Sequence, residues 1–482
     1  MVKESKQMGL DAFLFDDAAM RNFIVNGYCV LKVDLPASFH EQVFEKTKKI
    51  LAEEGNPGNN ILPRIPEVQE VFDAPAVKGA LTSILGPSYV MHVHRFAHPN
   101  GPGGNGGGWH KDSYWGYSKV RDHHPRWIMA MYYPQDAPPE IGPTGAIPGS
   151  QYYESRVASL PLSADVAALD PDGIGFPVAG EAGSVILIHF DLWHRAFPNH
   201  TDRERYMFKF QFTRLDEPMP NRAHWKRESA EIPLSAEQAE NPRSPLWRQM
   251  WHWLAGETAW ETEGDAEALK TALWDSSEET RLSAAYTLGG LGAAGVAVLR
   301  EGLLYDGERD EVRRAACYGL SVAGVAALPT LTEALSSESE RTRGYSVYAL
   351  GDLGARAAET LPALTALTDD PSAFVRRQLA DALGQIKSQP DLSVPALTCL
   401  LKDPDGQTRF NAAYGLAKFR EKAVAAVPAL TEALADENRY VRGHATIALE
   451  QLGSASPEAL KTLIHHFHTT RWCPITTRES TF

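Results

Sequence analysis

The segment Gly107-Gly108-Trp109-His110-Lys111-Asp112-Ser113 carries a His-x-Asp pair, around which we expect the first half of the chain to be organised. Residues two positions apart on an extended segment point to the same side, so the His110 imidazole and the Asp112 carboxylate should converge. Two histidines and one carboxylate on a single face are the ligand set that holds non-haem Fe(II). The segment therefore predicts a mononuclear iron site that needs one more histidine from later in the chain.

Two later histidines are candidates for that ligand. His189 and His194 lie five residues apart, the first within a predicted strand and the second beyond it. Their parity differs, so only one of them can face the metal if the strand is regular. A single His-x-Asp pair is common by chance, and a buried structural role for either histidine is the simpler alternative. We take His194 as the third ligand and His189 as its competitor.

Length and charge restrict the classes of function. The 482 residues exceed what one hydrophobic core usually serves, so at least two domains are expected. The 43% hydrophobic and 22% charged residues are typical of a soluble globular protein. The formal net charge is −14 and no Lys/Arg run stands out, which argues against nucleic acid as a partner.

The cysteines and the N-terminal sequence indicate a cytoplasmic protein. Cys29, Cys317, Cys399 and Cys473 are scattered without C-x-x-C pairing, which suits a reducing compartment. The first residues lack the apolar core of a signal peptide, and no apolar run approaches the length of a membrane span. We therefore expect a cytoplasmic location and no membrane partner.

Helical patterns come first in the chain and strand patterns follow. Amphipathic helices are predicted over residues 39–51 and 68–85, after a helix end, a turn at Gly27 and a short strand within 23–31. The later strand-like runs, broken by Gly and Pro, cover 89–97, 127–133, 184–189 and 206–213. This order favours an antiparallel sandwich or barrel backed by a helical layer.

Four motifs of this region occur in the order found in one family. They are Phe23…Gly27-Tyr28, Trp109-His110-Lys111-Asp112, Ile141-Gly142-Pro143…Ile147-Pro148-Gly149-Ser150-Gln151 and Gly183-Ser184-Val185…Trp193-His194-Arg195-Ala196. Together they resemble the phytanoyl-CoA dioxygenase (PhyH) family of Fe(II)/2-oxoglutarate oxygenases. The resemblance implies a double-stranded β-helix, which is a jelly roll of cupin-like type, with a helical backing layer. It also implies Fe(II), 2-oxoglutarate as cosubstrate and ascorbate as reductant.

The resemblance also assigns a role to Arg205. This residue falls eleven positions after His194, where the family places the arginine that binds 2-oxoglutarate. A planar, permanently charged guanidinium suits the remote carboxylate of 2-oxoglutarate because it can donate two parallel hydrogen bonds. This register is our reason for preferring His194 to His189. Along the same strand Arg205, Met207, Lys209 and Gln211 share one face, which is expected to line the cavity.

Two features modify what the resemblance implies. Arg195-Ala196 stand where the family often has Gly-Ser, whose hydroxyl helps to hold 2-oxoglutarate, so the hydroxyl is expected from elsewhere. Asp112 is retained, whereas related halogenases replace this carboxylate with a small residue to free a position for halide. Asp112 therefore favours hydroxylation over halogenation.

A repeat governs the chain beyond about Glu263. Prolines recur every 33 residues at Pro329, Pro362, Pro395 and Pro428, and arginines keep the same step at Arg343, Arg376, Arg409 and Arg442. Each unit should be a helix opened by proline, a turn and a second helix of small residues. A fixed period of this length is typical of an α-solenoid, whose units bury their apolar faces only by stacking. The units resemble HEAT repeats of the short kind found in bilin-lyase-like proteins.

We thus predict a multidomain protein with the following parts: an oxygenase domain at 1–220, a connector at 221–262, a separately attached HEAT-like solenoid at 263–465 and a tail at 466–482. The predicted function is Fe(II)- and 2-oxoglutarate-dependent hydroxylation of a C–H bond in a small-molecule metabolite. The solenoid would serve protein interaction or act as a scaffold. The alternatives are an interaction protein with a vestigial oxygenase domain, or an oxygenase acting on a protein that the solenoid recruits.

Overall fold

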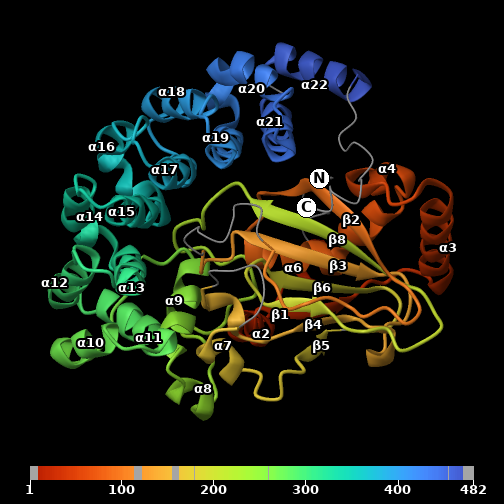
Figure 1. Ribbon diagram of the computed structural model, residues 1–482, viewed down its shortest axis with the longest axis horizontal. Coiled ribbons are helices and arrows are strands. Elements are labelled where there is room, and N and C mark those ends of the chain that lie inside the picture. Colours follow the sequence, from red (N-terminus) through yellow and green to blue (C-terminus); the bar gives the residue numbers. More distant parts are fainter. Residues whose placement is uncertain are drawn as a thin grey trace.

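An antiparallel β-sandwich with helices on one side forms the first part of the chain, and an arc of helix pairs forms the second (Figure 1). This computed structural model describes residues 9–112, 122–154, 162–178, 180–258, 260–453 and 455–469. The predicted multidomain architecture, a double-stranded β-helix followed by an α-solenoid, is confirmed. From residue 470 onward the predicted tail lies outside the described residues.

The N-terminal helices follow the expected pattern with one exception. α2 (Asp17–Asn26) ends at Gly27, whose left-handed conformation turns the chain directly into β1 (Tyr28–Lys32). The predicted single helix over 68–85 is wrong, because the structure has α5 (Val68–Asp73) and α6 (Pro75–Leu85) instead. Proline disfavours helical geometry in the residue before it, and Ala74 accordingly adopts ψ 140° and separates the two helices. The remaining helices here are α3 (Ala37–Glu54) and α4 (Ile61–Arg64).

Two antiparallel sheets make the sandwich. The larger has the order β1-β6-β3-β8-β2 and the smaller the order β5-β4-β7. The larger sheet adds β2 (Tyr89–Asn100), β3 (Trp127–Tyr133), β6 (Ser184–His189) and β8 (Arg205–Arg214) to β1. The smaller comprises β4 (Thr144–Ala146), β5 (Phe176–Val178) and β7 (His194–Ala196). The long strands match the predicted runs closely.

The two faces of β8 divide as the alternation predicts. On the outer face Phe72 of α5 packs on Phe210, with ring centroids 4.5 Å apart, and α6 packs against β1, β3 and β8. α3 joins this layer, because the His40 imidazole lies 2.7 Å from the Tyr132 hydroxyl. The inner face holds Arg205 and Lys209, both buried. The apolar layer of helices thus leaves the polar residues of β8 facing the interior of the sandwich.

The solenoid consists of successive helix pairs. The first helices of the pairs are α10 (Ala266–Leu273), α12 (Gly292–Leu303), α14 (Leu328–Ala334), α16 (Leu361–Thr365), α18 (Pro390–Leu400) and α20 (Val427–Ala433). The second helices are α11 (Glu278–Gly289), α13 (Asp310–Val322), α15 (Glu340–Asp352), α17 (Ala373–Ile386), α19 (Gly406–Phe419) and α21 (Arg439–Leu452), and α22 (Pro457–Thr469) follows. Proline lies in the first turn of α14, α16 and α20, as predicted. Pro395 differs, because α18 already begins at Pro390 and places Pro395 inside the helix.

Three of the repeated arginines each link their own unit to the next. Arg343 donates two hydrogen bonds to Asp370, and Arg376 and Arg409 donate two each to Asp403 and Asp436. Every pair spans 27 residues, from a second helix to the turn that precedes the next second helix. Two parallel charge-assisted hydrogen bonds fix the geometry of such a pair. The arginine period thus corresponds to a ladder that runs along the solenoid.

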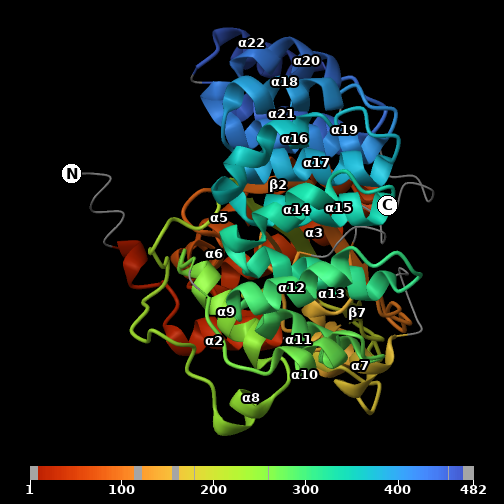
Figure 2. The same ribbon diagram turned by 90° about the vertical axis from the view of Figure 1, so that its left-hand side faces the viewer.

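The solenoid curves around the sandwich, which contradicts the expected separate attachment (Figures 1 and 2). The second helices of the pairs lie on its inner side, facing the strands. His123 lies 2.7 Å from the Tyr286 hydroxyl of α11, and Thr213 of β8 lies 2.6 Å from the Tyr414 hydroxyl of α19. At the last unit, His92 of β2 lies 3.0 Å from His444 of α21. The two parts therefore share a buried polar interface.

The connector packs between these two parts. It contains α8 (Ala236–Glu240) and α9 (Ser244–Leu254), and α9 contacts both α2 and α11.

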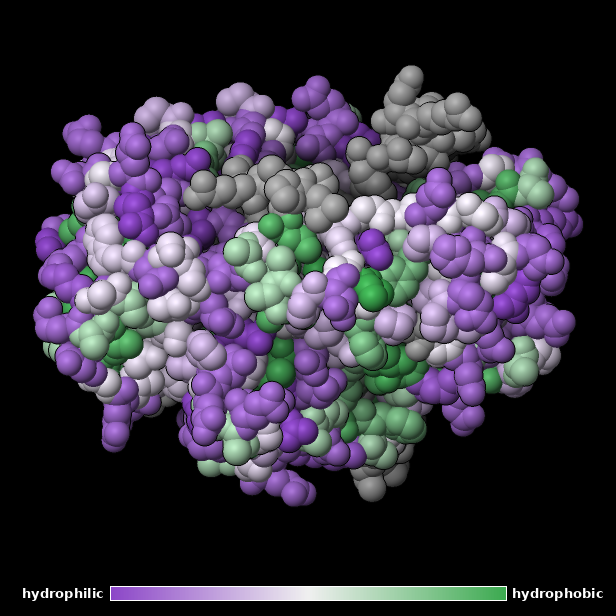
Figure 3. Space-filling model, turned by 60° about the horizontal axis from the view of Figure 1, so that its bottom comes forward, coloured by the Kyte–Doolittle hydropathy of each residue, from purple (hydrophilic) through white to green (hydrophobic). Residues whose placement is uncertain are grey.

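Among the described helices none is both long enough and apolar enough to cross a bilayer. The face drawn in Figure 3 is mostly hydrophilic, with its apolar side chains gathered mainly near the middle. A short helix, α7 (Ala164–Ala168), and 3-10 turns at Gly58–Asn60, Pro139–Ile141 and Ser150–Tyr152 complete the first part.

The interface histidines predict a loss of stability in mild acid. His444 donates from Nδ1 to the Phe410 carbonyl, so its Nε2 is left to accept a hydrogen bond from His92 Nε2. His92 Nδ1 in turn accepts from the His94 N–H. Each ring therefore uses one nitrogen as an acceptor, which requires the neutral imidazole. Burial lowers the pKa of His444 to about 4 and that of His123 to about 3, against about 6.5 in an unfolded chain.

The unfolded chain therefore binds protons that the native protein excludes, and the free energy of unfolding should fall as pH drops from about 6.5 toward 4. Urea unfolding at about pH 7 and about pH 5 measures this difference. His444→Gln should reduce the difference. An unchanged unfolding midpoint at the two pH values would contradict the prediction.

Candidate metal centre

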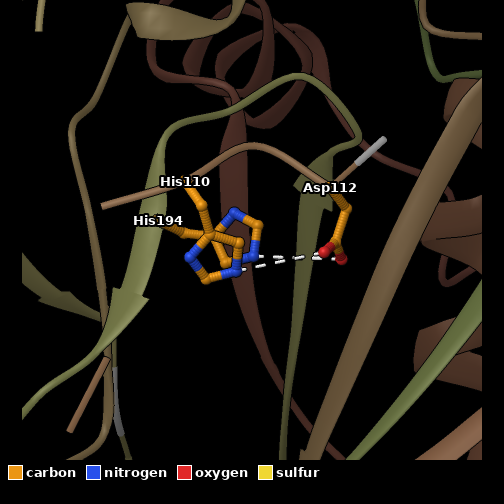
Figure 4. A group of neighbouring side chains, drawn as sticks. All are labelled: His110, Asp112 and His194. Carbon is orange, nitrogen blue, oxygen red and sulfur yellow. Dashed lines mark ion pairs between the residues drawn. The ribbon is translucent and has the colours of Figure 1, made fainter. Parts of the chain in front are cut away.

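His110, Asp112 and His194 converge on one point (Figure 4). His110 and His194 form an isolated antiparallel bridge, in which the N–H of each donates to the carbonyl of the other at 3.0 Å. The bridge brings the two rings side by side, with centroids 4.4 Å apart. Asp112, two residues further along the extended segment, turns its carboxylate toward the same point, as the parity argument predicts.

The orientation of the two imidazoles suits a metal. His110 Nδ1 lies 2.9 Å from the Gly108 carbonyl and His194 Nδ1 lies 2.9 Å from the Leu192 carbonyl, so both Nδ1 atoms donate to the backbone. The Nε2 atoms are then left as acceptors, which is the tautomer of a metal ligand. They lie 3.9 and 4.0 Å from the Asp112 carboxylate oxygens, and one donor atom from each residue falls within 4.8 Å of the others. The residues fit a divalent cation on one face.

A lysine balances the charge of this group. The Lys209 ammonium of β8 lies 2.8 Å from Asp112 Oδ2. Burial alone would raise the pKa of the Asp112 carboxyl, but Lys209, His194 and His110 together hold it well below its usual range. Burial also lowers the pKa of His194 to about 3. The carboxylate is therefore charged and His194 is neutral near neutral pH, as a ligand set for Fe(II) requires.

Arg205 begins β8 and lies deep in the sandwich, with only 2% of the residue exposed. Its Nε and Nη2 donate to the Gly142 carbonyl at 3.1 and 2.8 Å, and Nη1 donates to the His98 carbonyl at 3.3 Å. Gly142 holds a left-handed φ of 74° to present that carbonyl. No carboxylate pairs with this guanidinium among the described residues. It is thus a fixed buried cation that can still receive an anion.

Two hydroxyls, those of Tyr133 and Thr144, are candidates to replace the serine hydroxyl that the family often has where Arg195-Ala196 stand here. The Tyr133 ring lies 5.9 Å from the guanidinium carbon, and the Tyr133 hydroxyl lies 2.7 Å from Thr144 Oγ1. Arg195 itself lies over the Trp109 and Phe197 rings at 4.8 and 5.0 Å and donates to the Ile174 carbonyl. Arg195 is therefore occupied in packing the segment around the site.

The competing ligand His189 lies outside the group. It belongs to β6 opposite Ile128, whose neighbours Ala130 and Tyr132 share the face turned to the helical layer. Its Nδ1 accepts from the Asp191 N–H at 3.2 Å. His123 and His124 likewise contact the solenoid and the connector. Of these histidines, the structure brings only His194 to His110 and Asp112 within the described residues.

The sequence pattern placed Lys209 on the inner face of β8 but predicted no role for it. Its parity with Arg205 was the indication that it lies near the site, since residues 205, 207 and 209 point to one side of β8. Tyr133 and Thr144 were missed altogether. Tyr133 belongs to no motif, and Thr144 lies in the gap between the two halves of the motif at 141–151; their hydroxyls meet because β3 and β4 belong to facing sheets.

Several solved structures are similar to part of this chain. The non-heme alpha ketoglutarate dependent carbocyclase SnoK from nogalamycin biosynthesis is 18% identical, over 41% of this chain and 84% of that chain, with a TM-score of 0.34. EctD from S. alaskensis, solved with 2-oxoglutarate and 5-hydroxyectoine, is 17% identical over 41% of this chain and 75% of that chain, with a TM-score of 0.35. The non-heme monooxygenase ThoJ in its Ni complex is 17% identical over 44% of this chain and 84% of that chain, with a TM-score of 0.31.

Sequence models of two families match the chain, whereas a search of curated proteins gave no match. Residues 38–207 match the phytanoyl-CoA dioxygenase (PhyH) family, and this range contains His110, Asp112, His194 and Arg205. Residues 328–400 and 393–476 match HEAT repeats. The chain therefore joins a domain of the phytanoyl-CoA dioxygenase family to a run of HEAT repeats.

Proposed function

We propose that the chain is an Fe(II)- and 2-oxoglutarate-dependent oxygenase that hydroxylates a C–H bond of a small-molecule metabolite. One observation carries the proposal: His110, Asp112 and His194 direct three donor atoms to one point on the inner side of β8, the strand that begins with the buried Arg205. The match of residues 38–207 to an oxygenase family supports it. Ascorbate as reductant and a cytoplasmic location stay predictions, as do the domain boundaries.

His110, Asp112 and His194 would hold the ferrous ion, and Arg205 would anchor the remote carboxylate of 2-oxoglutarate. When bound, iron and 2-oxoglutarate would supply the oxidising chemistry together with O₂: one oxygen atom of O₂ would convert 2-oxoglutarate to succinate and CO₂, and the other would enter the C–H bond of the substrate. The backbone carbonyls of Gly108 and Leu192 keep both imidazoles in the tautomer that offers Nε2. These three residues would thus hold the metal on one face and leave its remaining positions for cosubstrate and oxygen.

The Tyr133 and Thr144 hydroxyls would complete the cosubstrate site in place of the missing Gly-Ser. They are buried, bonded to each other at 2.7 Å, and Tyr133 lies beside the Arg205 guanidinium. Lys209 would retain one oxygen of Asp112, so that the other remains for the metal. Its charge also favours anionic groups in the cavity, and 2-oxoglutarate carries two carboxylates.

Arg205→Lys is expected to weaken 2-oxoglutarate binding by about 10- to 100-fold, because lysine keeps the charge but cannot form two parallel hydrogen bonds. The loss corresponds to about 1.4–3 kcal/mol. The dissociation constant of 2-oxoglutarate can be measured by calorimetry on the Mn(II)-loaded protein. The exposed Arg203, two residues earlier, provides the matched control Arg203→Lys, for which no change is expected. Equal affinity of Arg205→Lys and wild type would remove Arg205 from the cosubstrate site.

The proposed reaction is tested by succinate release and by mass spectrometry of candidate metabolites. A gain of one oxygen atom that requires both iron and 2-oxoglutarate would establish the function. Absence of any succinate release from the iron-loaded protein, with and without a broad set of metabolites, would favour an interaction protein with a vestigial domain.

An oxygenase that acts on a protein partner remains the other alternative, since HEAT repeats are protein-interaction modules. In that case the oxygen would appear in a peptide rather than in a metabolite, and peptide mapping of a co-purified partner would detect it.

A further inference from the structure

The concave face of the solenoid is covered by the first part of this same chain (Figure 1). Four of its inner helices send polar side chains to that interface: Tyr286 of α11, Asp352 of α15, Tyr414 of α19 and His444 of α21. All four residues are buried. Solenoids of this type usually bind partners on the concave surface, so its occupation in cis calls for a function within the chain.

Residues 122–126, which precede β3, contact several elements at this interface. The His123 ring stacks on Tyr318 of α13 at 4.0 Å, and its Nδ1 bonds the Tyr286 hydroxyl at 2.7 Å. The His124 ring stacks on Trp253 of the connector at 4.0 Å and 11°. Its Nδ1 lies 2.8 Å from Asp352 Oδ1. This short segment is thus bound by three solenoid helices and by the connector: α11, α13 and α15 contact it together with Trp253.

Arg126 is the hub of the interface. Its guanidinium donates to both Glu217 oxygens at 3.0 and 2.8 Å and to Asp352 Oδ1 at 2.8 Å, and only 3% of the residue is exposed. A buried guanidinium needs such partners, because its charge has lost its hydration. Glu217 belongs to the first part of the chain and Asp352 to the solenoid. Arg126 therefore holds the two parts in one relative position.

Hydrogen bonds connect this interface to the strands that form the site. The Arg126 carbonyl accepts from the Arg214 N–H at 3.1 Å, and the Tyr414 hydroxyl donates to the Arg214 carbonyl at 2.5 Å. Arg214 ends β8, the strand that begins at Arg205 and carries Lys209. β3 and β8 pair directly along most of β3. The solenoid thus fixes one end of the two strands whose inner face lies against Asp112.

We infer that the HEAT solenoid acts in cis as an internal brace of the oxygenase site, with Asp352 and Tyr414 as positioning residues for the inner face of β3 and β8. A separate protein cannot occupy the concave face while the sandwich covers it, so any recruited partner binds elsewhere on the chain. The metal readout used below rests on the proposed function, whereas the exchange readout does not.

The test compares full-length Asp352→Asn and Tyr414→Phe with Asp403→Asn. Asp403 is the matched control, because it is similarly buried and also accepts two side-chain hydrogen bonds. Asp403 accepts both from Arg376 inside the solenoid ladder, whereas Asp352 accepts one from Arg126 and one from His124 across the interface. Hydrogen–deuterium exchange should quicken at the amides of β3 and β8 by about tenfold in Asp352→Asn and by a few fold in Tyr414→Phe. Titration with Mn(II) alone should show a dissociation constant raised by about tenfold in Asp352→Asn, an effect on the scale of a lost outer-shell contact.

Asp403→Asn should leave both quantities within about twofold of wild type, even if its melting temperature falls equally. The inference is overturned if both interface variants exchange like wild type at β3 and β8, or if Asp403→Asn changes exchange there as much as they do. If Asp352→Asn does not fold, Tyr414→Phe decides, since it removes a single hydroxyl. If wild type does not bind Mn(II), the proposed metal site is wrong. The exchange comparison then still tests whether the solenoid holds β3 and β8 in place.

Discussion

Asp112→Asn is expected to abolish metal binding and the turnover of 2-oxoglutarate while the fold persists. The variant removes the only carboxylate of the ligand group. Changes to outer-shell partners already cost about 10- to 100-fold in metal affinity or activity, so loss of a ligand should cost more than about 100-fold. Asparagine keeps a side-chain oxygen that can accept from Lys209, so this buried hydrogen bond persists in the variant. Calorimetric titration with Mn(II) and succinate release measure the two effects.

Alanine at position 112 is the less informative substitution. It would remove the carboxylate that the Lys209 ammonium contacts at 2.8 Å, and Lys209 is only 4% exposed. Breaking a buried charge pair costs about 3–5 kcal/mol. The double variant Asp112→Ala/Lys209→Met should recover most of that stability without recovering metal. Asp202→Asn, at an exposed position, is the control for the loss of a carboxylate. Wild-type Mn(II) affinity in Asp112→Asn would refute the ligand assignment.

Ending the chain at residue 262 is expected to give no soluble, folded oxygenase part. The truncation removes Asp352 from Arg126, Tyr414 from the end of β8 and the aromatic side chains that enclose His123. One broken buried charge pair costs about 3–5 kcal/mol, and each lost buried hydrogen bond costs about 1–3 kcal/mol. Their sum approaches the total stability of a domain, about 5–15 kcal/mol.

Soluble yield and circular dichroism of residues 1–262 test this expectation. Co-expression of residues 263–482 as a second chain should restore solubility, because the interface is noncovalent and buried. A cooperatively folded fragment 1–262 that consumes 2-oxoglutarate like the full chain would show that the oxygenase domain does not depend on the repeats.

The fold and the grouping of His110, Asp112 and His194 were largely predictable from periodicity and residue spacing. Alternation along β8 placed Arg205 and Lys209 on the inner face, and the two-residue spacing of His110 and Asp112 brought both to one side. The eleven-residue interval to Arg205 selected His194 over His189, and the structure brings His194 to the same point. The 33-residue proline and arginine period identified the solenoid, which the match to HEAT repeats confirms.

The contacts between distant segments were not predictable in the same way. His124 and Asp352 lie 228 residues apart, and neither stands in a periodic pattern that could have paired them. The adjacent His123 and His124 gave only a weak signal, since isolated histidines are usually structural. The break before Pro75 was visible in the sequence, but the apolar spacing of residues 68–85 continues through it and concealed the change of axis.

The ladder of Arg343–Asp370, Arg376–Asp403 and Arg409–Asp436 has a consequence for how this chain can change in length. Each rung is interchangeable, so an added or lost unit of 33 residues would leave the ladder itself intact. The anchors are not interchangeable, because the first units hold His123 and the last holds His92 across the width of one sandwich. Gain or loss of a unit between these two anchors would displace one end of the arc from its target, so the width of the sandwich restricts the number of repeats between them.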